Sequence, residues 1–501
     1  MLRTTERLSF SSRITKNRRL EWYQSPIGTP QNFGEKRRLI CGEVELIRAN
    51  MLAAGYDPRA IWIIALPAMV TNVATALIGI GDMWIVGHLG EAAAQGAVDV
   101  GAKLFALLFT VMNFLKTGTT GLVAQDGARE GPGAQAATLI RGLWVGLILA
   151  GALLLLKPLI LPALLSALGA EGSVLANARI YAEIRYWTAP GVFANLALIG
   201  FLVGRRQVRA ALLIEVLYNL TNIGLGLWFV LGAGYGIAGI GWSSFIAEYT
   251  KLVGLALFIL LGETGRHLRA ALRVKGALGW AAMRPFLSVN RDLFLRTLVL
   301  TIAMAALTRL GAERGPVVLA ANGIVYQMFV FSALLLDGFE NAAQVLNGER
   351  FGAGDRPGFL RYVRALVWRS LGAAAVLSAA FLLLADPILA SFAATDAVRE
   401  EAQSLSLWLI FIPFAGAASF VFDGVFVGAS WTRALLLSML GATAIYALLL
   451  WQTWPLGNAG LWLSFTIYLL ARAALQALLI PRLAGTIGVS TRMGRPQGGK
   501  R

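Results

Sequence analysis

Twelve long apolar stretches separated by short polar ones constrain the fold of this chain more than any other feature. A helix needs about 20 apolar residues to cross the hydrocarbon core of a bilayer. The pattern therefore predicts an all-α membrane protein with about twelve transmembrane helices. We expect them at residues 60–86, 94–124, 137–166, 178–203, 209–232, 237–262, 286–308, 316–345, 361–390, 402–429, 431–453 and 458–482.

Composition supports the membrane assignment. Hydrophobic residues make up 57% of the chain and charged residues 14%, whereas soluble proteins carry about 25% charged residues. The net charge of +17 could suit nucleic acid. However, the basic residues lie between the apolar stretches, where they orient a protein in the bilayer. We expect membrane lipid rather than nucleic acid as a partner.

Polar segments divide the chain into five parts. The first is basic and lacks the apolar core of a signal peptide, so we expect either a disordered tail or a true start at Met51. The parts are an extension (1–56), a six-helix lobe (57–265), a cytoplasmic linker (266–285), a second six-helix lobe (286–485) and a basic tail (486–501).

The distribution of arginine predicts the orientation. Connections after even-numbered stretches are basic, as at Arg205 and Arg206, whereas 87–93 and 231–236 carry no Lys or Arg. Short loops rich in Lys and Arg stay in the cytoplasm. Both termini are therefore expected in the cytoplasm, with the protein in the inner (plasma) membrane.

The two lobes show an internal duplication. Leu89-Gly90 matches Leu310-Gly311, and Asp126-Gly127 matches Asn347-Gly348, each at an offset of 221 residues. Six helices is an even number, so both halves insert in the same orientation. In such parallel repeats the substrate site lies near the bilayer midplane, where the repeats meet.

Motifs for other functions are missing from the sequence. It contains no phosphate-binding G-x-x-x-x-G-K-[ST] loop and no G-x-S-x-G element. His88 and His267 are far apart, and Cys41 is the single cysteine, so we expect no metal site, cofactor or enzymatic activity. A transporter of this kind would use an ion gradient, which directs attention to acidic residues within the apolar stretches.

Asp82 is the first such residue, because it follows an uncharged run from Ala60 to Gly81. A carboxylate at the centre of the membrane costs about 2.5 kcal/mol or more, so it is usually functional. Spacing alone leaves open a solvated position at the end of the helix.

Buried amides are the next candidates. Asn219 and Asn222 are three residues apart and share a helix face, and Asn195 is central in its stretch. Such amides form either a binding site or hydrogen bonds between helices. Glu215 and Glu340 have more polar surroundings and are expected nearer the cytoplasm.

The second lobe contains further charged candidates. Asp337 and Asp423 each precede a glycine inside an apolar stretch. Asp292 and Arg296 are four residues apart, which predicts a structural ion pair along one helix.

Several of these elements resemble the multidrug and toxic compound extrusion (MATE) family. The likeness covers residues 57–485 and includes features typical of its DinF branch. It rests on Pro67, Asn72, Asp82, Gly87, Leu89-Gly90, the segment 118–131, Asn290, Asp292, Arg296, the segment 319–322, Asp337-Gly338 and the segment 422–428.

The resemblance implies two lobes around a central cleft and an antiport mechanism, in which a proton or sodium ion enters while an organic cation leaves. It also implies that Asp82 takes the coupling ion and that Asn195 and Asn222 belong to its polar network. Family members commonly have an Asp where this chain has Gly226. Loss of that carboxylate weakens a sodium site and favours protons.

We therefore expect a monomeric, proton-coupled antiporter that exports small organic, cationic compounds in multidrug (xenobiotic) efflux. The alternative is a lipid-linked precursor flippase of the same superfamily. Flippases often line the cleft with several basic residues, whereas Lys116, Lys157 and Arg185 are the notable ones inside the stretches of this chain.

Overall fold

The computed structural model describes residues 56–89, 91–273, 278–393 and 395–488. Among these residues, twelve helices are long and apolar enough to cross a membrane, which confirms the all-helical prediction. The helices from Pro58 onward belong to one compact unit. Residues 1–55 of the predicted extension, including Cys41 and Met51, and all but the first three residues of the predicted tail lie outside the described residues.

The N-terminal half contains six spanning segments, two of which join consecutive helices. They are α3 (Pro58–Gly87), α4 (Ala92–Val111) with α5 (Phe114–Arg129), α6 (Pro132–Leu155), α8 (Gly172–Arg185) with α9 (Ala189–Gly204), α10 (Val208–Leu227) and α11 (Gly236–Leu261).

The C-terminal half contains the other six, and three shorter helices connect the segments. The spanning helices are α13 (Trp280–Ala312), α14 (Pro316–Gly352), α15 (Arg356–Phe392), α17 (Ser406–Gly428), α18 (Thr432–Gln452) and α19 (Gly457–Ala484). The short ones are α7 (Lys157–Ala167), α12 (Thr264–Leu272) and α16 (Asp396–Ser404).

Several predicted boundaries differ from the structure, among them those of the third and seventh stretches. The predicted stretch 137–166 breaks at Leu156, so that α6 spans alone and α7 is separate. Pro158 explains the break, because proline lacks an N–H and disfavours a helical residue before it. The seventh span begins at Trp280 rather than 286, so the predicted linker contains most of α12 and the first turns of α13.

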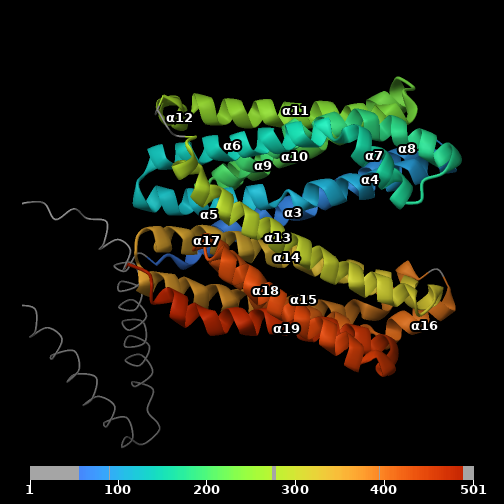
Figure 1. Ribbon diagram of the computed structural model, residues 1–501. Coiled ribbons are helices and arrows are strands. Elements are labelled where there is room, and N and C mark those ends of the chain that lie inside the picture. The colour runs from blue at the N-terminus through green and yellow to red at the C-terminus, as the bar shows by residue number, and fades with distance from the viewer. Residues whose placement is uncertain (1–55, 90, 274–277, 394, 489–501) are drawn as a thin grey trace, which may run out of the picture. The chain divides into compact units, whose positions relative to one another are not determined.

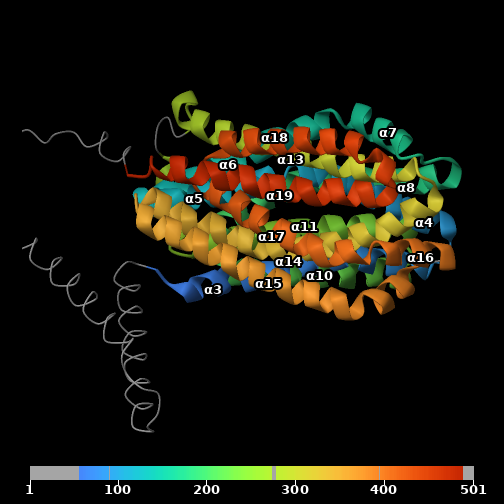
Figure 2. The same cartoon turned by 90° about the horizontal axis from the view of Figure 1, so that it is seen from below.

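The two halves lie side by side with their helices roughly aligned, and α13 crosses between them (Figure 1). Figure 2 shows the bundle from the side on which the C-terminal helices lie. Helix α14 packs against α15 and α17 of its own half and against α3 and α5 of the other. It is therefore the main link between the halves.

The halves meet closely at the end of the bundle that carries Arg205. Gln125 Nε2 donates to the Gly428 carbonyl at 2.6 Å, and Arg206 Nε donates to Glu349 Oε1 at 2.6 Å. At Gly121, an added Cβ would lie 2.7 Å from the Val427 carbonyl oxygen, so only glycine fits this contact. This end of the two halves is tightly closed.

Helix α3 contributes to both halves. Trp62 stacks edge-on against Phe339 at 5.4 Å, and Asn72 Nδ2 donates to the Leu334 carbonyl at 3.0 Å. Its last turns instead pack on α10, where a Cβ at Gly81 would lie 3.3 Å from Ile223. Asp82 therefore sits in the part of α3 that belongs to the N-terminal half.

Candidate functional site

Asp82 is buried among the helices of the N-terminal half. It lies five residues before the end of α3 and is 3% exposed. Arg185, at the end of α8, is the charged group that interacts with it. Within the part of the chain that the structure describes, Asp82 Oδ1 has no hydrogen-bond partner. The position is therefore not a solvated helix end.

The three predicted asparagines are buried, and two of them bond to α11. Asn222 Nδ2 donates to Ser244 Oγ at 3.2 Å, and Asn195 Nδ2 donates to Glu248 Oε1 at 2.7 Å. Ser244 and Glu248 are four residues apart on α11 and share one face. These bonds connect α9, α10 and α11 in one polar cluster.

The N-terminal half contains several buried acceptors for which the described part of the chain offers no donor. The Oδ1 atoms of Asp82, Asn195, Asn219 and Asn222 all lack a hydrogen-bond donor among the described residues. A buried polar atom left without a partner costs about 1–3 kcal/mol. A proton or another cation would supply the missing donor or charge. The site is thus suited chemically to bind a cation.

Three neighbouring residues were not predicted from the sequence. Tyr218 hydrogen-bonds to Glu248, and Lys251 Nζ lies 2.8 Å from Glu215 Oε2 and 4.5 Å from the Tyr218 ring centre. Glu215 and Lys251 are both nearly buried. The signal available in the sequence for this pair was Lys251 itself, a charged residue eleven positions before the end of the predicted stretch 237–262.

Asp423 forms a separate cluster in the C-terminal half. It is fully buried and accepts from Arg472 Nη2 at 2.6 Å, from Gln476 Nε2 at 2.5 Å and from Arg296. The predicted pairing of Arg296 with Asp292 is therefore wrong. Asp292 instead lies 2.8 Å from Arg291 Nη2 and accepts from Thr432.

Lys116 connects the acidic groups of the two halves electrostatically. It lies on α5 and interacts with Glu215 of the N-terminal half and with Asp337 and Glu340 of α14. Lys116 and Asp337 are 221 residues apart, so they occupy matching positions in the two repeats. The duplication has placed opposite charges at one position of the two halves.

Gly226 packs against α3 at Ile85. A Cβ there would lie 3.1 Å from Ile85 Cδ1 and 3.6 Å from Ser243 Oγ. Ile85 is three residues after Asp82 on the same helix. An apolar contact therefore occupies the place of a second carboxylate.

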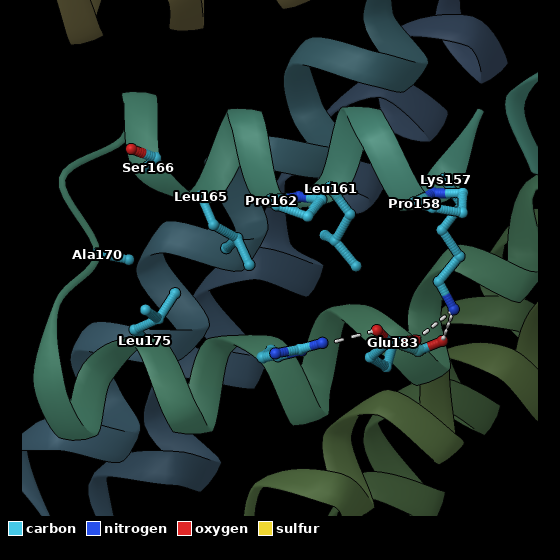
Figure 3. Close-up of a pocket in the computed structure, with 10 residues that line it drawn as sticks. Lys157, Pro158, Leu161, Pro162, Leu165, Ser166, Ala170, Leu175 and Glu183 are labelled. Atoms are coloured by element: carbon cyan, nitrogen blue, oxygen red, sulfur yellow. Dashed lines mark hydrogen bonds and ion pairs between the residues drawn. The ribbon is translucent and has the colours of Figure 1, made fainter.

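A pocket of about 560 Å³ lies elsewhere, between α7 and α8 (Figure 3). Lys157 forms an ion pair there with Glu183, and Leu161 and Leu175 contribute apolar walls. None of the predicted site residues lines it. The basic side chain of Lys157 is neutralised within this pocket.

Comparisons with known proteins agree with this architecture. The MatE family model matches residues 67–228 and again residues 293–451. "DNA damage-inducible protein F" of Escherichia coli is 34% identical over 83% of this chain and 90% of its own. "Probable multidrug resistance protein NorM" of Chromobacterium violaceum is 24% identical over 87% of this chain and 96% of its own.

Solved structures share the fold. One is titled "Outward-facing conformation of a multidrug resistance MATE family transporter of the MOP superfamily". It superposes with a TM-score of 0.76 at 19% identity and covers 86% of this chain and 97% of that one.

Two helical halves that match the same transporter model define a membrane transporter built by duplication, not an enzyme. The chain belongs to the MATE family, and its resemblance to the DinF branch is confirmed.

Proposed function

We propose that the protein is a proton-coupled antiporter that exports organic, cationic compounds across the inner membrane. The observation that carries this proposal is the burial of Asp82, with an unpaired carboxylate oxygen, in the same half of the protein as three buried amides whose oxygens lack donors among the described residues. A carboxylate in this position can hold either a proton or a cationic compound. The multidrug resistance named for a relative supports organic compounds as substrates.

The proposed mechanism is an exchange at Asp82. When ionised, Asp82 attracts an organic cation, because charges interact strongly away from water. When protonated, it loses that charge and donates a hydrogen bond to an amide oxygen of the cluster. Proton entry therefore releases the substrate, and deprotonation restores the site.

Two features favour protons over sodium. Sodium is best held by several charged oxygens, and this chain has Gly226 where related sequences commonly carry an Asp. Across residues 56–488, apart from the undescribed positions, no three His, Cys, Asp or Glu side chains gather into a metal site. A single carboxylate is sufficient for proton exchange.

The arginine-rich end of the bundle is proposed to face the cytoplasm, with both termini on that side. Gln125, Gly121 and Arg206 join the two halves there. The described conformation is then closed towards the cytoplasm, and exchange with the outside takes place at the opposite end.

The charge pairing argues against a lipid-linked precursor flippase. Such a protein needs free positive charge to hold a pyrophosphate. Lys251 is instead paired with Glu215, and Arg472 with Asp423.

Transport into and out of liposomes tests the proposal. We would reconstitute the protein, impose a pH gradient at fixed sodium and follow efflux of a fluorescent organic cation. The gradient should drive efflux by the wild type and not by Asp82→Asn, which, like the protonated form of Asp82, should bind the compound only weakly.

Asp99→Asn is the matched control, because Asp99 is an exposed carboxylate paired with Lys103 on α4. This variant should retain gradient-driven efflux. Equal efflux by wild type and Asp82→Asn would refute the coupling role of Asp82. Efflux driven by sodium alone would refute proton coupling.

A further inference from the structure

A groove of about 680 Å³ lies between the first half of α13 and helices α4–α6. Its walls are largely apolar and include Leu149 of α6 and Leu287 of α13. The rings of Phe114 and Phe294 meet there edge-on, with centres 5.7 Å apart. Since these rings belong to different halves of the protein, the groove follows the seam between them.

Two arginines of α13 line the same groove. Arg284 and Arg291 are seven residues apart, so they project from one face of the helix about two turns apart. Arg284 is exposed. Arg291 is 65% exposed, and Asp292 Oδ1 accepts from its Nε and Nη2. Asp292 therefore orients the Arg291 guanidinium and leaves Nη1 for another ligand.

The groove begins at the arginine-rich end of the bundle. Arg205 donates to Thr264 at the start of α12, and exposed Trp280 begins α13. Trp is enriched at membrane–water interfaces. Residues 280–294 rise about 21 Å along α13, close to the ~20 Å of one leaflet with its headgroups. The groove thus runs from the headgroup level towards the middle of the membrane.

We propose that this groove is a binding site for an anionic phospholipid. The lipid phosphate lies at Arg284 and Arg291, and one acyl chain follows Leu287 towards Phe294. Basic pockets between transmembrane helices bind anionic headgroups, and the apolar walls match an acyl chain. None of the residues of the Asp82 cluster lines the groove, so this site is separate from the proposed transport site.

The position of the site suggests what the lipid does. Helix α13 packs against α5 of one half and against α14 and α18 of the other. A lipid in this groove would contact both halves at once. It would therefore stabilise the two halves in the relative position that the structure shows.

Native mass spectrometry of the purified, delipidated full-length chain tests the proposal. We would titrate phosphatidylglycerol and phosphatidylcholine with identical acyl chains. The wild type should bind phosphatidylglycerol more tightly. Arg284→Gln with Arg291→Gln should weaken this binding about 25-fold, at about fivefold for each arginine, and leave phosphatidylcholine binding unchanged.

The control is Arg356→Gln with Arg364→Gln, which removes two exposed arginines of α15 that do not line the groove. It should keep the preference for phosphatidylglycerol. Leu287→Trp fills the groove without changing its charge and should also lose the tight binding. The size-exclusion profile of each variant reports whether it is folded.

Equal binding of both lipids to the wild type would overturn the proposal. So would an unchanged preference in the variant that lacks Arg284 and Arg291, or an equal loss in the α15 control. Tight binding retained by Leu287→Trp would show that the headgroup binds the arginines without the groove, which contradicts the site as proposed.

Discussion

At the scale of single residues, the buried carboxylates Asp82 and Asp423 differ in how they are paired. Asp423 is surrounded by donors from Arg296, Arg472 and Gln476, whereas Asp82 keeps a carboxylate oxygen without a partner. A fully paired carboxylate resists protonation because its partners stabilise the charged form. We therefore assign a structural role to Asp423 and the exchange of protons to Asp82.

Removal of the Asp423 charge should destabilise the fold. Asp423→Asn leaves two buried arginines without a counter-charge, which we expect to lower the free energy of unfolding by about 3–5 kcal/mol. Chemical denaturation of the purified protein measures the free energy of unfolding. Asp386→Asn, at an exposed position on α15, should change it by less than about 0.5 kcal/mol.

A double variant separates pairing from packing. Arg296→Gln added to Asp423→Asn removes one of the unpaired cations and should recover part of the lost stability. If Asp423→Asn is as stable as Asp386→Asn, the ion pairs of Asp423 do not stabilise the fold, which would contradict this prediction.

The sequence located several of these residues but not their partners. The uncharged run before Asp82 marked it as a candidate, and its burial is consistent with that choice. The four-residue spacing of Asp292 and Arg296 predicts contacts along one helix but not contacts between helices. Arg296 pairs instead with Asp423, 127 residues away, and packing between α13 and α17 cannot be derived from spacing.

At the scale of helices, close packing of α5, α14 and α17 closes one end of the bundle. An added Cβ at Gly348 would lie 3.0 Å from Ala124 Cβ and 3.1 Å from the Gly428 carbonyl oxygen. Small residues permit such backbone approach in membranes. The contact joins the two halves, so its disruption should change which side of the protein is accessible.

Gly348→Leu should open this end. The side chain does not fit between α5 and α17, so we expect labelling of a cysteine at Val427, now 2% exposed, to become several-fold faster. The rate of maleimide labelling measures it in a Cys41→Ser background, because Cys41 is the single cysteine.

Gly372→Leu is the matched control, because a Cβ at Gly372 meets no atom within 4 Å. Labelling of the Val427 cysteine should be unchanged by it. Equal labelling in both glycine variants would contradict closure at Gly348.

The helices themselves were well predicted, because apolar stretches of sufficient length have few alternatives in a bilayer. The break between α6 and α7 was missed, although Pro158 and Pro162 lie inside the predicted stretch. Apolar residues continue on both sides of Leu156, so hydropathy alone predicts one uninterrupted helix. The two prolines indicate the break better than hydropathy does.

At the scale of the whole molecule, duplication explains the arrangement. Each half matches the same family model, and six spans per half give both the same orientation. The offset of 221 residues predicted this from the sequence. The relation of the halves to each other could not be predicted, because it depends on contacts such as Gln125 with Gly428.

The orientation in the membrane can be tested directly. In the Cys41→Ser background, a membrane-impermeant maleimide applied to intact cells should label Tyr235→Cys and not Ala353→Cys. Both positions are exposed, and the second should react only after permeabilisation. The reverse pattern would place both termini outside.

The central claim is that a proton and an organic cation compete for Asp82. The most direct test measures proton release when an organic cation is added to purified protein in weakly buffered detergent solution near neutral pH. We predict that the wild type releases up to one proton per bound cation and that Asp82→Asn binds the cation only weakly and releases no proton. Equal release by the variant, or binding to the wild type with no release, would contradict the account.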